Sequence, residues 1–169
     1  PVHAFDSLIR RVRRRAALLA AGVLLAGMSA CAVQTQALRT QPPPGLARAH
    51  ELAATPFFAQ TEHHCGPAAL ATVLAAASLP TAPETLADQV FLPARGGTLQ
   101  AEMLAGARRQ GAVATRIPGT LEAAFTEVRA GHPPVVLLNL GLSWLPTWHY
   151  AVLVGYDLSN GLARSEGKR

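Results

Sequence analysis

The sequence predicts an α+β fold in which an N-terminal helical half packs on a C-terminal antiparallel sheet. Four segments between positions 65 and 131 carry helix signals, whereas the apolar runs at 135–140 and 150–156 are rich in β-branched residues. Helices come first and strands last, unlike the alternation of a βαβ fold. Half of the 169 residues are hydrophobic, which is enough for one domain with a substantial core.

The first 30 residues form a leader of three parts. Arginines cluster at positions 10–15, the stretch 16–27 is apolar, and small residues precede Cys31. This layout resembles a bacterial lipoprotein signal peptide, whose cleavage leaves the cysteine first in the chain and lipid-modified. An uncleaved signal anchor is the alternative, because residues 16–33 carry no charge and are just long enough to span a bilayer. Both place the rest of the chain in the bacterial cell envelope, on the periplasmic side of the inner or outer membrane and tethered to it.

Positive charge is concentrated in this leader. The chain has 15 basic and 10 acidic residues, and its isoelectric point is near 10.2. Five of the basic residues are arginines of the leader, and from Cys31 onward the net charge by count is only +1. A nucleic-acid partner, which a basic chain would suggest, therefore has no support in the working domain.

Residues 31–55 are predicted to form a tether. They contain three consecutive prolines at 42–44 and few patterned hydrophobic residues, which favours an extended polyproline conformation. We therefore expect a signal peptide over residues 1–30, the tether over 31–55 and the folded domain over 56–169.

Four helices and one short strand are expected in the helical half. Pro67 and Pro83 suit the first turns of the first and second helices. Thr98 is the expected cap of the third helix, and glycines end the third and fourth. The predicted helices cover 65–77, 81–91, 97–112 and 120–131, and the predicted strand covers 112–117.

The C-terminal third has strand character. The runs 135–140 and 150–156 are apolar and β-branched enough for central strands, and residues 157–161 predict a hairpin turn between strands. The tail at 162–169 is polar and lacks a strand pattern.

Cys65, one of only two cysteines, opens the first predicted helix. If Cys31 carries lipid, Cys65 has no disulfide partner and is a free thiol in an oxidising compartment. A helix N-terminus stabilises a thiolate through its unpaired N–H groups and the positive end of its dipole, and Gly66 is expected to leave the approach to the sulfur open. The position therefore predicts a nucleophile, with a small buried core cysteine as the alternative.

A thiolate nucleophile needs a base that is close in space. His149 is the best candidate of the six histidines, because it stands directly before the apolar run at 150–156. Gln60 lies five residues before Cys65, so its amide can join the Cys65 backbone N–H in stabilising an oxyanion. The neighbouring His63 and His64 predict no metal site, since side chains in an extended turn point apart and no zinc-ligand spacing is present. No metal or cofactor is expected.

Two stretches, "PFFAQTEHHCGPAALATVL" and "WHYAVLVGYD", resemble the papain-like bacteriocin-processing peptidases, which are the double-glycine leader peptidases and their stand-alone relatives. The resemblance covers about residues 56–157, and the leader suggests a stand-alone lipoprotein member. It implies a papain-like α+β fold with Cys65 as nucleophile, His149 as general base and acid, and Gln60 in the oxyanion hole. It also implies a peptide or protein substrate that is cut after small residues, as in a Gly-Gly leader.

Such peptidases orient the catalytic histidine with an Asp or Asn on the following strand. If the hairpin turns at Ser159 and Asn160, the position opposite His149 falls near or just beyond Arg169, so the expectation is a domain truncated at the C-terminus or lacking its last strands. Asp157 is the nearest acidic candidate for the orienting role, although eight residues along a straight strand span about 25 Å.

Three functions stay open on the sequence alone. The first is a membrane-tethered cysteine peptidase with Cys65, His149 and Gln60 in its site. The second is an inactive peptide-binding or assembly lipoprotein with the same fold, and the third is a thiol-dependent acyltransferase. The sequence indicates no oligomeric state.

Overall fold

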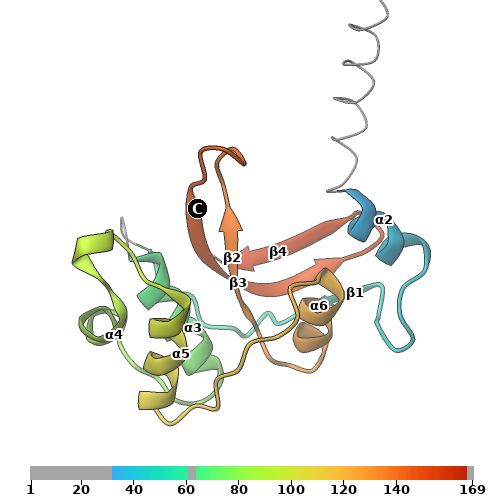
Figure 1. Cartoon of the computed structure of the whole chain (residues 1–169). Helices are drawn as coiled ribbons and strands as arrows, with labels where there is room; N and C mark the ends of the chain where they lie inside the picture. The colour runs from blue at the N-terminus through green and yellow to red at the C-terminus, as the bar shows by residue number, and fades with distance from the viewer. Residues whose placement is uncertain (1–31, 61–63, 167–169) are drawn as a thin grey trace, which may run out of the picture.

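The computed structural model describes residues 32–60 and 64–166, so the leader prediction and Cys31 lie outside the described residues. The helices are α2 (Ala32–Thr40), α3 (Cys65–Ala76), α4 (Pro83–Val90), α5 (Gln100–Arg109) and α6 (Leu121–Arg129), with a 3-10 turn η1 at Pro93–Arg95 (Figure 1). The strands are β1 (Ala49–Glu51), β2 (Val135–Asn139), β3 (Trp148–Asp157) and β4 (Leu162–Glu166). Within these ranges no helix has the length and apolar character needed to cross a bilayer.

The predicted α+β class is confirmed. Helices α3, α4 and α5 lie together on one side of an antiparallel sheet, and α6 lies on the other side with α2 beside it (Figure 1). The helix prediction is confirmed for α3, α4, α5 and α6, whose observed ends lie within a few residues of the expected ones.

Strand β3 is the centre of the sheet, because the other three strands all pair with it in antiparallel register. Val152 pairs with both Val135 of β2 and Glu166 of β4, which places β2 and β4 on opposite edges of β3. Strand β1 continues the β2 edge, where Ala49 pairs with Asp157. Strand β3 has neighbouring strands on both edges and is buried along most of its length. For this reason its sequence is a nearly continuous apolar run, which is the strongest strand signal in the chain.

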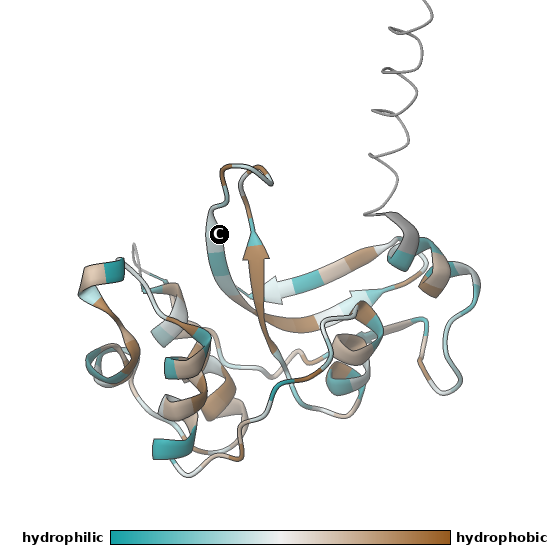
Figure 2. Cartoon of the chain, viewed as in Figure 1, coloured by the Kyte–Doolittle hydropathy of each residue, from teal (hydrophilic) through white to brown (hydrophobic). Residues whose placement is uncertain are grey.

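Alternating side chains of β3 pack into two separate hydrophobic clusters. Tyr150, Val152 and Val154 belong to the cluster formed with α3, α4 and α5. Leu153 and Tyr156 belong to the second cluster, which α6 closes on the other face. Figure 2 shows the middle of β3 in brown between these two groups of helices. Because burial of apolar surface drives folding, β3 holds both halves of the domain together.

The segment expected to be a tether is largely part of the fold. Residues 32–40 form α2, whose Leu38 is buried in the second cluster together with Leu46. The backbone of β1 is paired with β3, and the Arg39 guanidinium donates to the carbonyl of Ser159 at 3.3 Å. The prediction missed these elements because two isolated leucines give no periodic pattern, and only the paired strand brings them to α6.

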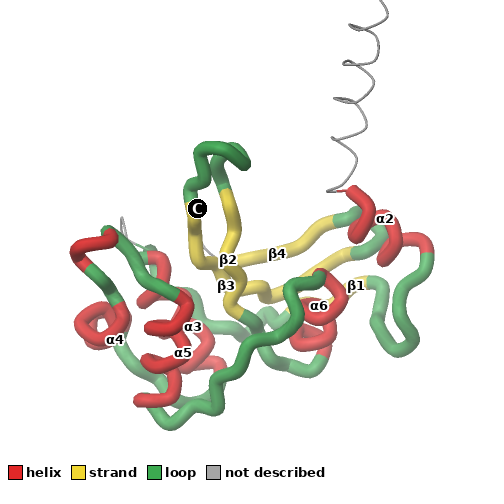
Figure 3. The backbone as a smooth tube through the Cα atoms, in the orientation of Figure 1, coloured by secondary structure: helices red, strands yellow, loops and turns green. Residues whose placement is uncertain are grey.

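Four local expectations differ from the structure. Residues 112–117 form no strand but a loop between α5 and α6, in which Val113 is 97% exposed (Figure 3). Strand β2 is an edge strand in the described part of the chain, not a central one. The polar tail at 162–166 forms β4. It pairs with the long strand β3, and Arg164 forms an ion pair with Glu51 at 2.8 Å, so this strand forms without an apolar pattern. Thr98 does not cap α5, whose N-cap position is Leu99.

Candidate active site

Helix α3 begins at Cys65, as the sequence predicts. His64 precedes the helix with φ −101° and ψ 24° and makes no side-chain cap hydrogen bond. Pro67 occupies the first turn, where its missing N–H has no helical partner to lose, and it is fully buried. Most of the helix is buried, so the first turn is fixed by packing of the residues that follow it. This arrangement holds Cys65 at the positive end of a rigid helix.

The space beside Gly66 is filled by Thr98. A Cβ atom added at Gly66 would lie 2.6 Å from Thr98 Oγ1 and 2.7 Å from Thr98 Cβ. Thr98 Oγ1 is buried, and no hydrogen bond to it is found within the described ranges. The missing side chain of Gly66 lets the segment before α5 pack against the start of α3.

Cys65 is a free, partly buried thiol that packs against the α3 cluster. Within that cluster it acts on Tyr150: burial raises the pKa of the Tyr150 hydroxyl, and the negative charge of a Cys65 thiolate raises it further. Tyr150 is the residue that follows His149 in β3.

Gln60 reaches the same point on β3. Its Nε2 donates to the backbone carbonyl of Tyr150 at 3.5 Å, which is a long hydrogen bond. Its Oε1 is buried and has no hydrogen-bond partner in the part of the chain described here. Because an amide nitrogen carries two hydrogens and this bond is weak, Gln60 can exchange it for a stronger acceptor.

His149 is the second residue of β3 and pairs with Leu138 of β2. Its Nε2 atom is buried. Side chains of a strand alternate between its two faces, so His149 lies on the same face as Ala151. Tyr150 lies on the opposite face, which packs on α3. Cys65 packs against the cluster that contains Tyr150, the residue next to His149, and Gln60 bonds to the Tyr150 carbonyl.

Asp157 lies at the opposite end of β3. Its carboxylate accepts hydrogen bonds from the backbone N–H groups of Ser159 and Asn160 and from the Asn160 side chain at 2.6 Å. These bonds, with the Asn160 side chain contributing most, lower the pKa of Asp157. The structure therefore uses Asp157 to close the turn between β3 and β4. The described part of β4 ends opposite Val152, and the position opposite His149 lies outside the described residues.

His64 lies on the α4 side of Cys65. Its ring meets Phe91 edge-to-face, with the ring centroids 4.9 Å apart. His63, the other histidine beside the thiol, lies outside the described residues.

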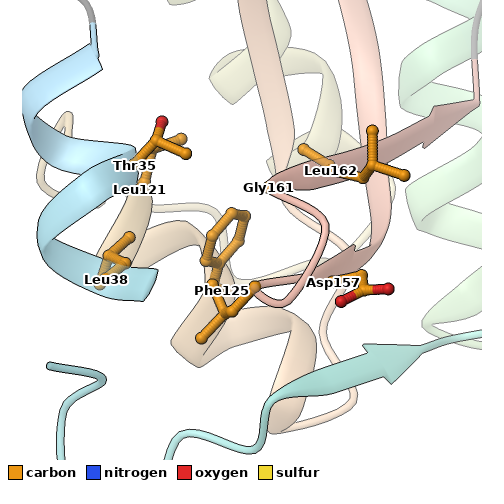
Figure 4. Close-up of a pocket in the computed structure, with 9 residues that line it drawn as sticks. Thr35, Leu38, Leu121, Phe125, Asp157, Gly161 and Leu162 are labelled. Atoms are coloured by element: carbon orange, nitrogen blue, oxygen red, sulfur yellow. The ribbon is translucent and has the colours of Figure 1, made fainter. Parts of the chain in front are cut away.

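A small apolar pocket of about 190 Å³ lies at the Asp157 end of the sheet (Figure 4). Side chains from α2 and α6 and the turn between β3 and β4 line it, among them Leu38, Phe125 and Leu162. Neither Cys65 nor Gln60 borders it. Of the residues that the sequence nominates for chemistry, the pocket is bordered by Asp157 and not by Cys65, Gln60 or His149.

This α+β fold carries a thiol at the start of a buried helix, which packs against a sheet strand whose second residue is a histidine. It has the architecture of the papain-like cysteine peptidases. The chain belongs to the Peptidase_C39 like family, which it matches over residues 53–164. Searches of the curated proteins and of the solved structures gave no match. Membership of this family supports a cysteine peptidase.

Sequence reasoning missed two residues of this region. The sequence gives Tyr150 only as a strand residue. The packing of α3 on β3 places it in the cluster against which Cys65 packs, and its carbonyl accepts a hydrogen bond from Gln60. Thr98 reads as a helix cap, whereas its side chain packs against Gly66. No local sequence signal could have found either contact, because each joins segments more than 30 residues apart.

Proposed function

We propose that this protein is a cysteine peptidase that acts outside the cytoplasm at a membrane surface. The observation that carries the proposal is the meeting of Cys65 and Gln60 at Tyr150, the neighbour of His149, in a chain of the Peptidase_C39 like family. A cysteine nucleophile requires an electropositive, partly exposed position, and Cys65 is partly exposed at a helix N-terminus.

The proposed chemistry runs through an acyl-enzyme. His149 takes the proton of the Cys65 thiol, and the thiolate attacks the carbonyl carbon of the scissile peptide bond. The imidazolium returns the proton to the leaving amine as the C–N bond breaks, which leaves the acyl group on sulfur. Water, deprotonated by His149, then attacks the thioester, releases the new carboxyl end of the substrate and restores the thiol.

Gln60 is proposed to stabilise the oxyanion. Its long bond to the Tyr150 carbonyl can be given up when a negatively charged oxygen forms beside Cys65, because hydrogen bonds to charged acceptors are shorter and stronger. The Cys65 backbone N–H at the start of α3 is the second donor.

The leader supports a location in the cell envelope, with lipid on Cys31 as the proposed anchor. The resemblance to the double-glycine leader peptidases suggests a bond after small residues, such as a Gly-Gly pair, as the one that is cut. A peptide or protein segment is thus the proposed substrate.

The test is cleavage of a synthetic Gly-Gly leader peptide by the purified full chain, followed by mass spectrometry. We expect cleavage by the parent chain, and none by Cys65→Ala or His149→Ala. His132→Ala is the matched control. The His132 side chain is exposed, and in the described part of the chain its ring forms a hydrogen bond only with the Glu127 carboxylate. Equal cleavage by Cys65→Ala and the parent chain would refute the assignment of the nucleophile.

A further inference from the structure

The connection between β2 and β3 presents apolar side chains to solvent. We call residues 140–147 the hairpin tip; four of its large apolar side chains are between 56% and 76% exposed, namely Leu140, Leu142, Trp144 and Leu145. Trp148, which borders the tip, is 59% exposed. No charged residue occurs between positions 133 and 148. Apolar groups gathered in this way on a protein surface usually mark a site of contact with a partner or membrane.

The hairpin tip is held in one shape by hydrogen bonds. Asn139 Oδ1 accepts from the N–H groups of Gly141 and Thr147, at 3.0 and 2.9 Å. The backbones of Leu142 and Leu145 exchange two hydrogen bonds of 3.1 Å across the loop. A Cβ atom at Gly141 would collide with the Leu145 carbonyl, so the loop requires glycine there. The fold therefore orders these apolar side chains while leaving them in water.

The tip projects beyond the body of the domain. Figure 1 shows the hairpin of β2 and β3 rising above the helices, and Figure 2 shows brown segments at its end. Tryptophan beside leucine on a protruding, uncharged loop fits the boundary between lipid headgroups and acyl chains, where the ring finds both apolar and polar surroundings.

The start of α2 lies on the same side of the molecule. Helix α2 begins at Ala32, at the upper edge of the described fold in Figure 1, and the hairpin tip lies at that edge as well. The 31 residues that precede α2 include the apolar stretch 16–27 and Cys31. Since α2 packs on α6 through Leu38, a membrane attachment before Ala32 would bring this side of the domain to the bilayer.

From these observations we propose that the hairpin tip docks into the headgroup boundary of a lipid bilayer. Trp144 and its leucine neighbours enter the lipid, and α2 and the tip make two points of attachment. Two points fix the orientation of the domain in a way that a single anchor cannot. Trp148 links the tip to His149, so the proposed catalytic region would lie next to the membrane. The inference rests on the membrane location in the proposed function but not on its chemistry.

The chain offers a direct optical test, because Trp144 and Trp148 are its only two tryptophans. Full chain carrying Cys65→Ala and Trp148→Phe is reconstituted into phosphatidylcholine vesicles, with and without bromine near the top of the acyl chains. Bound protein is recovered by flotation before fluorescence is read. We expect Trp144 emission to be blue-shifted and to fall roughly twofold in the brominated vesicles, since interfacial tryptophans sit at the headgroup boundary.

A matched variant removes the ordering of the tip. Asn139→Ala deletes the acceptor of two loop hydrogen bonds but none of the apolar side chains, and we expect it to lose most of the bromine quenching while the protein still floats. Floating protein whose Trp144 stays unquenched by bromine and open to aqueous iodide would overturn the docking proposal and leave the peptidase proposal intact. Protein that does not float would overturn both the docking and the membrane location. Cleavage activity is measured on separate samples with intact Cys65, so a failure of the peptidase chemistry is seen independently.

Discussion

Replacing Gly66 with alanine tests how the start of α3 is positioned. The new Cβ atom would lie 2.6 Å from Thr98 Oγ1 and 2.7 Å from Thr98 Cβ. Nonbonded carbon atoms prefer separations of about 3.5–4.0 Å, so the two segments would have to part by about 1 Å. Overpacking of this kind costs about 1–3 kcal/mol, whereas alanine is a better helix former than glycine by about 1 kcal/mol. We therefore expect Gly66→Ala to lower the free energy of unfolding by about 0–2 kcal/mol.

The effect on activity should be larger than the effect on stability. A displacement of about 1 Å in the residue beside the nucleophile can cost on the order of 10²-fold in rate. The assays are urea unfolding and kcat/KM on the Gly-Gly peptide. Thr98→Gly removes the side chain that collides, so the double variant Gly66→Ala/Thr98→Gly should regain much of the lost rate.

Gly97→Ala is the matched control for this experiment. A Cβ atom at Gly97 has no atom within 4 Å, and the substitution lies next to Thr98 in the chain. We expect it to change stability by less than about 0.5 kcal/mol. If Gly66→Ala were stabilised by the full helix preference of alanine and kept its rate, the contact with Thr98 would have no part in positioning Cys65.

Three further substitutions test the site, the core and the turn. Gln60→Ala should lower kcat on the Gly-Gly peptide by about 10²–10³ with little change in KM, and an equal rate would exclude Gln60 from the oxyanion hole. Leu74→Ala should lower the free energy of unfolding in urea by about 2–5 kcal/mol, because Leu74 is 1% exposed; a loss below that range would mean that the surrounding cluster closes over the cavity. Asp157→Asn should lower the midpoint of thermal unfolding at neutral pH. Because its hydrogen bonds lower the pKa of Asp157 in the folded state, the stability that they contribute is present above the unfolded-state pKa and is lost as the pH falls through the folded-state pKa. The difference between Asp157→Asn and the parent chain should therefore vanish in strong acid, and a difference that persists there would refute a role for the charge.

The sequence predicts those helices and strands whose structure is determined by residues within the element itself. The long apolar run of β3 and the proline in the first turn of α3 are local signals, and each element forms where expected. Helices and strands that form only by contact with a segment distant in sequence could not be predicted from local sequence signals. Helix α2, strand β1 and strand β4 contain few apolar residues, and each is held by β3 or by the cluster around α6.

The same distinction applies to the candidate site. The position of Cys65 at the start of a helix was predictable, because the proline that marks the first turn is close to it in sequence. The contact of Gln60 with the Tyr150 carbonyl and the packing of Thr98 on Gly66 depend on how helices sit on the sheet, which no local pattern encodes. Asp157 holds the turn through a hydrogen bond from Asn160, which is only three residues later in the chain. Only the structure reveals this role.

The proposed function depends on Cys65 as the nucleophile and on His149 as the base that takes its proton. Its most direct test is the rate of Cys65 alkylation by iodoacetamide at about pH 6, where an ordinary thiol is almost fully protonated, with the modified residue located by mass spectrometry. We expect Cys65 of the parent chain to react at least tenfold faster than the cysteine of an unstructured peptide. We expect His149→Ala to lose most of this excess rate and His132→Ala to keep it. A Cys65 that reacts no faster than the peptide, at a rate that the His149 substitution leaves unchanged, would contradict it.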